Sequence, residues 1–192
     1  MKDKCIGFAM CGSFCTLERA VDSLEELRAL CGNVVPIMSE RAYCLDTRFG
    51  KASDFAARVS SLCGADIIHD ICGAEPLGPA APLDILVIAP CTGNTLAKIA
   101  HGITDSSVTM AAKAHLRNGR PVLIAVATND ALAVNLANIG ALLNRKNVYF
   151  VPFYQDDCIG KPSSLASDLG VLPEAITAAL SGKQLQPVIR CV

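Results

Sequence analysis

The sequence predicts an α/β protein built on a doubly wound, parallel sheet of about six strands. Short apolar runs alternate with segments in which apolar residues recur every three or four positions, the order typical of βαβ units. Hydrophobic residues make up 52% of the chain and aromatic residues only 5%, which suits a sheet covered by helices on both faces. The 192 residues contain no linker or internal repeat, so we expect one domain spanning residues 1–192.

The first half of the chain predicts three strands and two helices. The strands are expected at Lys4–Met10, Asn33–Met38 and Ala65–His69. A helix capped by Thr16 is expected to run to about Leu30, because leucines and Val21 recur at helical spacing. A second helix is expected over Ser53–Cys63. Gly73–Pro82 contains two glycines and three prolines, which predicts a loop.

The second half continues the alternation. Strands are expected at Leu83–Ala89, Pro121–Ala127 and Asn147–Phe153. Asp105 is expected to cap a helix that stops at Gly119, and Thr128–Asp130 to cap the next helix. The apolar face of that next helix is predicted to consist of Leu132, Leu136, Ile139 and Leu143. A last helix over about Ser164–Leu180, which Pro173 could interrupt, precedes an extended tail.

Three strand ends are expected to meet in one cleft. Right-handed crossovers and a strand order of 3-2-1-4-5-6 place the first and fourth predicted strands side by side at a crevice. The first, fourth and fifth strands end in Met10–Ser13, Pro90–Thr95 and Thr128–Asp130, which are rich in hydroxyls, amides and glycines. Each tip precedes a helix whose first N–H groups lack intrahelical partners. The sequence therefore predicts an anion site made of neutral donors, suited to a mononucleotide or flavin phosphate.

Several ligand classes are disfavoured. No G-x-G-x-x-G follows the first strand, and Gly7 and Gly12 lack the lysine of a P-loop, so classical NAD and ATP binding by this chain is not expected. A net charge of −1 without a basic face argues against nucleic acid, and no apolar stretch is long enough for a membrane span. The ten cysteines and three histidines show no metal-ligand spacing, so we expect no metal site and reduced thiols in the cytoplasm.

Several segments resemble known flavin-binding proteins. Residues 92–106, TGNTLAKIAHGITDS, resemble the Ser-Ala-Asn-Thr segment of flavin-containing cysteine decarboxylases and flavin prenyltransferases, which bind FMN. A closer resemblance, to the B subunits of bacterial dipicolinate synthases, covers nearly the whole chain. The segments that carry it include GAEPLGP (73–79), LVIAPCTGNT (86–95), DSSVTMAAKAHLRNGRPV (105–122), FVPFYQDD (150–157) and GKQLQPVI (182–189).

This resemblance implies a Rossmann-like fold of the flavoprotein type and a role in making dipicolinate for bacterial spores, in the cytoplasm of the mother cell. In that family's reaction the small dicarboxylate 2,3-dihydrodipicolinate is oxidised, and the A subunit is the one similar to NAD- or NADP-dependent dehydrogenases. The implied protein is an oxidoreductase subunit that pairs with the A subunit, has FMN as a candidate cofactor and forms a homo-oligomer. A stand-alone FMN enzyme and a non-catalytic scaffold for the A subunit stay open as alternatives.

The chain departs from the cysteine decarboxylases where those enzymes carry their chemistry. The loop before the fourth predicted strand, residues 73–79, contains no histidine. The Ala-Met-Asn of the decarboxylases is Ala127-Thr128-Asn129 here. Cysteine decarboxylation is therefore not expected.

The strand tips and the resemblance together name the candidate site residues. The expected cofactor contacts are Gly12, Ser13, Ser39, Thr92, Gly93, Asn94, Thr95, Asp105 and Asn129. Arg48 is the candidate for a substrate carboxylate, because arginine binds carboxylates in a bidentate manner; Arg117 and Arg120 are weaker candidates. Glu75 and Asn129 are the catalytic candidates, with Glu75 as acceptor of the proton that aromatisation releases. Helix caps, a tight turn and surface ion pairs are the structural alternatives.

Overall fold

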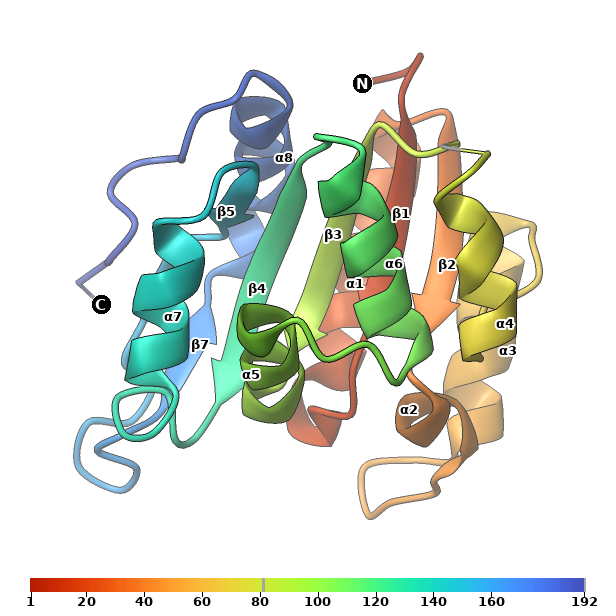
Figure 1. Ribbon diagram of the computed structural model, residues 1–192. Helices are drawn as coiled ribbons and strands as arrows, with labels where there is room; N and C mark the ends of the chain where they lie inside the picture. Colours follow the sequence, from red (N-terminus) through yellow and green to blue (C-terminus); the bar gives the residue numbers. More distant parts are fainter. Residues whose placement is uncertain (81, 192) are drawn as a thin grey trace.

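The computed structural model describes residues 1–80 and 82–191 and shows one sheet between two layers of helices (Figure 1). The strands are β1 Cys5–Met10, β2 Asn33–Met38, β3 Ile85–Cys91, β4 Val122–Thr128, β5 Val148–Phe150, β6 Phe153–Tyr154 and β7 Leu165–Ser167. The seven-stranded sheet has the order β2-β1-β3-β4-β7-β6, and β5 also pairs with β4. The prediction that the first strand lies beside the one after the 73–82 segment is confirmed, since β1 pairs with β3.

The centre of the sheet is parallel and fully buried. Ala9 of β1 lies opposite Ile37 of β2 and Ile88 of β3, and all seven residues of β3 are buried. β4 pairs in parallel with β3 and with β5. β7 and β6 run antiparallel and add an edge to the end of β4 that was not predicted. Parallel pairing aligns the carboxyl ends of β1, β3 and β4, which positions the site.

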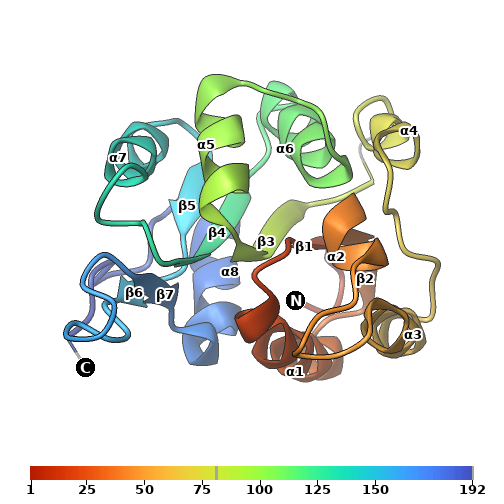
Figure 2. The same cartoon turned by 90° about the horizontal axis from the view of Figure 1, so that it is seen from below.

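Helices cover both faces of the sheet, as Figure 2 shows in the view from below. They are α1 Phe14–Leu30, α2 Glu40–Cys44, α3 Ala52–Cys63, α4 Ile71–Ala74, α5 Gly93–His101, α6 Ser107–Arg117, α7 Leu136–Leu143 and α8 Leu172–Leu180, with 3₁₀ turns at Glu75–Leu77 and Leu169–Val171. α1, α3 and α8 pack on one face around Phe8, and α5, α6 and α7 on the other around Ile88. Within residues 1–80 and 82–191, none of the helices has the length and apolarity needed to cross a membrane.

The first half differs from the prediction at three places. α1 begins at Phe14, earlier than a cap at Thr16 would give, because the Thr16 hydroxyl turns back to Ser13 (Oγ1 to Oγ 3.2 Å) inside the first turn. Segment 65–69 forms a single bridge, Ile37 to Ile68, instead of a strand. It is cut short because Asp70 accepts a hydrogen bond from Gly73 N (2.7 Å) and so starts α4.

Two further short elements lie where loops were expected. α2 follows β2 directly, because the Ser39 hydroxyl accepts a hydrogen bond from Ala42 N (3.3 Å) and caps it. The expected loop Gly73–Pro82 begins with the end of α4 and the 3₁₀ turn at 75–77, and its residue 81 lies outside the described residues.

The second half of the chain differs more from the predicted elements. Ser106, not Asp105, caps α6, since its hydroxyl accepts from Thr109 N (3.2 Å). α7 begins only at Leu136, and of its predicted apolar face Leu132, Leu136 and Leu143 are exposed while Ile139 is buried. The cause is Asp130, whose carboxylate accepts hydrogen bonds from Thr128 Oγ1 (2.5 Å) and Asn135 Nδ2 (2.9 Å) and thereby closes a turn.

The last predicted strand and helix are both divided. Pro152, which has no N–H, separates β5 from β6 within the expected strand Asn147–Phe153. The expected helix Ser164–Leu180 consists of β7, a 3₁₀ turn and α8. Asp168 starts that turn by accepting a hydrogen bond from Gly170 N (3.1 Å). The tail is extended as predicted where Phe153 N donates to Val188 O (3.0 Å).

Candidate functional site

The carboxyl ends of β1, β3 and β4 lie side by side (Figure 2). They open into one cleft of about 480 Å³. Its floor is made by Gly12 and Ser13 after β1, Thr92 after β3, and Thr128 and Asn129 at the end of β4. The structure thus brings together residues from all three strand tips on which the sequence analysis concentrated. A volume of this size is typical of pockets for small ligands.

Two loops from distant parts of the chain flank this floor. Arg48 and Phe49 come from the loop between α2 and α3, and the Arg48 guanidinium lies 4.8 Å from the centre of the Phe49 ring. Asp156 and Lys161 come from the loop between β6 and β7. The sequence analysis missed Lys161, because the residues before Ser164 were interpreted as a loop that leads into a helix. In the structure they join β6 to β7, and Lys161 lines the cleft.

Ser13 lines the cleft, and its hydroxyl shares a hydrogen bond with the Thr16 hydroxyl. It occupies the N-cap position of α1, but within the described residues its side chain makes no capping hydrogen bond and instead lies 3.2 Å from the Thr16 hydroxyl. The neighbouring Gly12 lies close to the Phe14 ring, which a Cβ on Gly12 would approach to 3.2 Å. The start of the 17-residue α1 therefore presents N–H groups, a hydroxyl and an aromatic ring to a ligand.

Thr92 is both a helix cap and a cleft residue. Its Oγ1 accepts a hydrogen bond from Thr95 N (3.3 Å) and donates to Thr95 Oγ1 (3.1 Å). Thr95 is buried and supports Thr92 without lining the cleft, while Asn94 is exposed beside it. Of these three candidates, only Thr92 faces the cleft.

Gly93 packs against side chains of the turn that follows β4 instead of facing a ligand. A Cβ at Gly93 would lie 2.5 Å from Asn135 Nδ2 and 2.7 Å from both Asp130 Oδ1 and Thr128 Oγ1. The start of α5 therefore packs directly on the hydrogen-bonded turn that follows β4. This contact accounts for glycine at position 93 by close packing.

Three other candidates lie outside the cleft. Ser39 caps α2, and the neighbouring Glu40 carboxylate accepts a hydrogen bond from Ser107 N (3.1 Å), so the N-terminus of α6 already holds an anion. Asp105 forms an ion pair with Lys98 (2.7 Å). Glu75 is exposed on the 3₁₀ turn that follows α4, and this turn packs against α6.

Two buried thiols lie beneath the floor. Cys11 follows β1 and Cys91 ends β3, and both side chains are buried. Their mutual hydrogen bond lowers the pKa of Cys11 and, together with burial, raises the pKa of Cys91 well above its ordinary value. Cys91 is therefore a packed core residue and not a reactive thiol.

A larger concavity of about 730 Å³ lies between α2 and α3, where the Tyr43 and His69 rings stack 4.0 Å apart. Asp46 and Asp66 line it, whereas Arg48 and Lys161 line the cleft at the strand ends. An anionic ligand therefore suits the strand-end cleft better. Among the described residues, no three histidine, cysteine or acidic side chains gather into a metal site.

The family follows from comparison with known proteins. The sequence model of the family described as Flavoprotein matches residues 1–170. The chain belongs to the flavoprotein family. This flavoprotein is 44% identical over 189 residues to the B subunit of dipicolinate synthase from Bacillus subtilis, an alignment that covers 98% of this chain and 94% of that protein.

Solved structures agree with this assignment. The crystal structure of the dipicolinate synthase B subunit from Bacillus halodurans superposes with a TM-score of 0.91 and 43% identity, covering 99% of this chain and 97% of that one. The FMN-dependent cysteine decarboxylase SpaF superposes with a TM-score of 0.71 and 23% identity, covering 93% and 96%, which shows a shared fold. The resemblance and the Rossmann-like flavoprotein fold predicted from the sequence are confirmed.

The cleft of this flavoprotein combines polar groups with apolar walls. Ser13 and the N–H groups at the start of α1 are neutral donors suited to a phosphate. The Thr92 hydroxyl donates to Thr95 Oγ1 and would have to turn toward a ligand to join them. Phe14, Phe49 and Leu165 provide apolar walls for a flat ring system. Ser39 and Asp105, which were also predicted to contact the cofactor, have side chains engaged by the protein itself.

Proposed function

We propose that this flavoprotein is the B subunit of a dipicolinate synthase. It would act with an A subunit that carries NAD or NADP, oxidising 2,3-dihydrodipicolinate to dipicolinate in the mother-cell cytoplasm of a spore-forming bacterium. The observation that carries the proposal is the 44% identity to a protein of that name across 98% of the chain. The absence of a dinucleotide fingerprint after β1 is consistent with a nicotinamide held by the partner.

The chain's own contribution would be to bind and orient the dicarboxylate. Aromatising a dihydropyridine removes a hydride and a proton, and the hydride would go to the nicotinamide of the partner. Arg48 would pair with a carboxylate, while Ser13 and Thr92 would hydrogen-bond to it from the floor. Asn129 would orient the ring. Glu75, predicted as the proton acceptor, lies outside the cleft and takes no part in this arrangement, so the proton would pass to water.

FMN is the alternative occupant that we propose for the same cleft, because Ser13 and Thr92 cannot hold a substrate carboxylate and a phosphate at the same time. When bound, it would supply a hydride acceptor in place of the partner's nicotinamide. Ser13, Thr92 and the backbone at Gly12 would hold its phosphate, and Phe14 and Leu165 would contact its ring. These residues bind and position; the electron transfer is the chemistry of the cofactor.

The proposal is tested by reconstitution. The purified protein, alone and mixed with the A subunit, is assayed for conversion of dihydrodipicolinate to dipicolinate, and its flavin content is measured by absorbance and mass spectrometry. We expect activity only from the pair, and a loss of about tenfold or more for Thr92→Val, which keeps the shape but removes the hydroxyl. Equal activity of the A subunit without this protein would refute the proposal.

Two other outcomes separate the alternatives. Activity of the flavin-loaded protein without a partner would identify a stand-alone FMN enzyme. Full activity of the pair after Thr92→Val and Ser13→Ala, with the partner still required, would identify a scaffold whose cleft takes no part in the reaction.

A further inference from the structure

We propose that Lys161 and Arg48 form a pair of opposed cations that bind the two carboxylates of one flat dicarboxylate. In this arrangement Lys161 sets the preference for a dicarboxylate over a monocarboxylate. The inference rests on the proposed function, because it concerns the same cleft and the same class of substrate.

The two side chains line the same cleft and come from loops on opposite sides of the strand ends. Arg48 belongs to the loop between α2 and α3, and Lys161 to the loop between β6 and β7. Figures 1 and 2 both show these loops on either side of the carboxyl ends of β1 and β4. The floor between them consists of neutral groups from Ser13, Thr92 and Asn129. A ligand with negative charge at two separated positions matches this distribution better than a single compact anion.

Both cations are available to a ligand. The nearest acid to Lys161 is Asp156, with Nζ 4.0 Å from Oδ2, and the Lys161 side chain is 58% exposed. An exposed ion pair at that distance contributes little, so Lys161 can turn toward a carboxylate at small cost. Arg48 stacks on Phe49, and none of the described acidic residues forms an ion pair with it.

The loop that carries Lys161 is held in shape by its own hydrogen bonds. Lys161 N donates to Asp157 O (2.9 Å), and Lys161 O accepts from Ser164 N (2.9 Å). Gly160 N donates to Asp157 Oδ1 (2.7 Å), and Gln155 Nε2 donates to Pro162 O (2.6 Å). The backbone at Lys161 is therefore fixed relative to β7, and only the side chain must adjust when a ligand enters.

Charge balance indicates what Lys161 adds. Among the described residues that line the cleft, Arg48 and Lys161 are positive and Asp156 is negative. A monocarboxylate can be neutralised by either cation alone. A dicarboxylate needs both, because its second carboxylate would otherwise lose water without gaining a charged partner.

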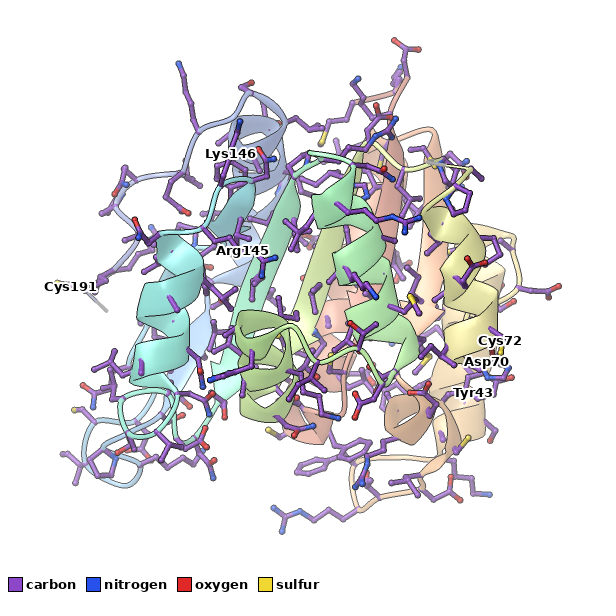
Figure 3. All side chains as sticks on the ribbon, viewed as in Figure 1. Tyr43, Asp70, Cys72, Arg145, Lys146 and Cys191 are labelled. Carbon is purple, nitrogen blue, oxygen red and sulfur yellow. The ribbon has the colours of Figure 1, made fainter. Side chains whose placement is uncertain are left out.

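Isothermal titration calorimetry on the full chain, with and without the A subunit, tests this inference. The probes are dipicolinate and pyridine-2-carboxylate, which share the ring and one carboxylate. We expect Lys161→Met to lower the affinity for dipicolinate about tenfold or more and the affinity for pyridine-2-carboxylate less than twofold. The double variant Lys161→Met with Arg48→Met should lose measurable affinity for both compounds. Lys146→Met is the matched control, since Figure 3 shows Lys146 at the opposite end of the sheet.

The outcomes separate this inference from the proposed function. If the wild type binds dipicolinate and Lys161→Met leaves the ratio of the two affinities unchanged, the inference is wrong and the proposed function stands. If Lys161→Met weakens the binding of FMN but not that of riboflavin, Lys161 binds a phosphate and the inference is also wrong. No binding of dipicolinate to the wild type in either form would overturn the inference and count against the proposed function.

Discussion

Gly93 illustrates how one residue in a cofactor-like motif can serve packing. It begins α5 at the rim of the cleft, where a flavin contact was expected. Instead it touches the side chains of Thr128, Asp130 and Asn135, which are joined by hydrogen bonds. A side chain at this position would separate two of the three strand ends that form the floor.

Gly93→Ala is therefore expected to destabilise the protein by about 1–3 kcal/mol, because the new methyl group meets polar atoms that hold one another in place. Urea unfolding followed by circular dichroism measures this. Gly140→Ala is the control, since a Cβ there meets nothing within 4 Å. In the middle of α7, that change should stabilise by about 0.5–1 kcal/mol. Equal effects of both substitutions would contradict the packing role.

His115 makes stability depend on pH. It lies buried on α6, and its Nε2 has no hydrogen-bond partner within residues 1–80 and 82–191. Burial, with the positive charge of Arg120, lowers its pKa from 6.5 to about 4. The unfolded chain therefore binds a proton more readily, so stability should fall as pH drops from about 6.5 to 4, by at most about 3 kcal/mol.

His115→Gln should flatten this part of the pH–stability curve, as measured by urea unfolding between pH 7 and pH 4. His101→Gln on the exposed side of α5 should leave the curve unchanged. An unaltered slope in the His115 variant would show that other groups cause the acid sensitivity.

At the scale of elements, Gln184 closes an open edge of the sheet. Its Nε2 donates to Phe150 O (2.7 Å) and its Oε1 accepts from Phe150 N (2.8 Å), so one side chain pairs with β5 as a neighbouring strand would. An unpaired edge strand is a site for aggregation, and this amide occupies it.

Gln184→Ala should lower the free energy of unfolding by about 1–2 kcal/mol, because two backbone groups of Phe150 lose their partners. Gln186→Ala removes one exposed hydrogen bond, to Val188 N, and should cost less than about 0.5 kcal/mol. Thermal unfolding of both variants checks the difference, and similar melting temperatures would contradict the edge role.

The elements that could be predicted are those whose sequence pattern and surroundings agree. The limits of β2 were predicted correctly, because its apolar run is buried between β1 and α3. The helix predicted over Ser164–Leu180 failed because Asp168 starts a separate turn and Leu165 pairs with Thr128 of β4. Such pairing between distant segments overrides local propensity and leaves no periodic signal in a strand of three residues.

The same reasoning applies to the cleft. Its floor could be predicted, because parallel strand order alone decides which tips meet. Arg48 was found because its residue type suits a carboxylate. Lys161 could not be found, since its position depends on the antiparallel hairpin of β6 and β7. Ser39 and Asp105 have suitable chemistry, but neighbouring groups already use it.

At the scale of the whole molecule, exposed apolar side chains recur along residues 132–143, which comprise α7 and the turn before it. Val134 is 74% and Leu136 50% exposed, and Leu132 and Leu143 are exposed beside them. Four large apolar side chains on one short segment are unusual for a monomer. They support our expectation that the protein forms a homo-oligomer.

Val134→Lys combined with Leu136→Lys should therefore reduce the mass in solution, measured by size-exclusion chromatography with light scattering. Charged side chains in a buried apolar contact cost far more than on a free surface. Leu30→Lys, at the end of α1 on the other face of the sheet, is the matched control. A monomeric wild type would refute the expectation directly.

The residues that line the cleft extend along the sequence from Gly12 to Ala166. The cleft therefore forms only when most of the polypeptide has folded. A ribosome-bound chain that lacks the β6–β7 hairpin would have an incomplete ligand-binding site. Ligand at a hundred times its dissociation constant should raise the unfolding free energy by about 2.7 kcal/mol, since it recognises the completed molecule alone. Substrate supply would then protect the newly made protein from proteolysis.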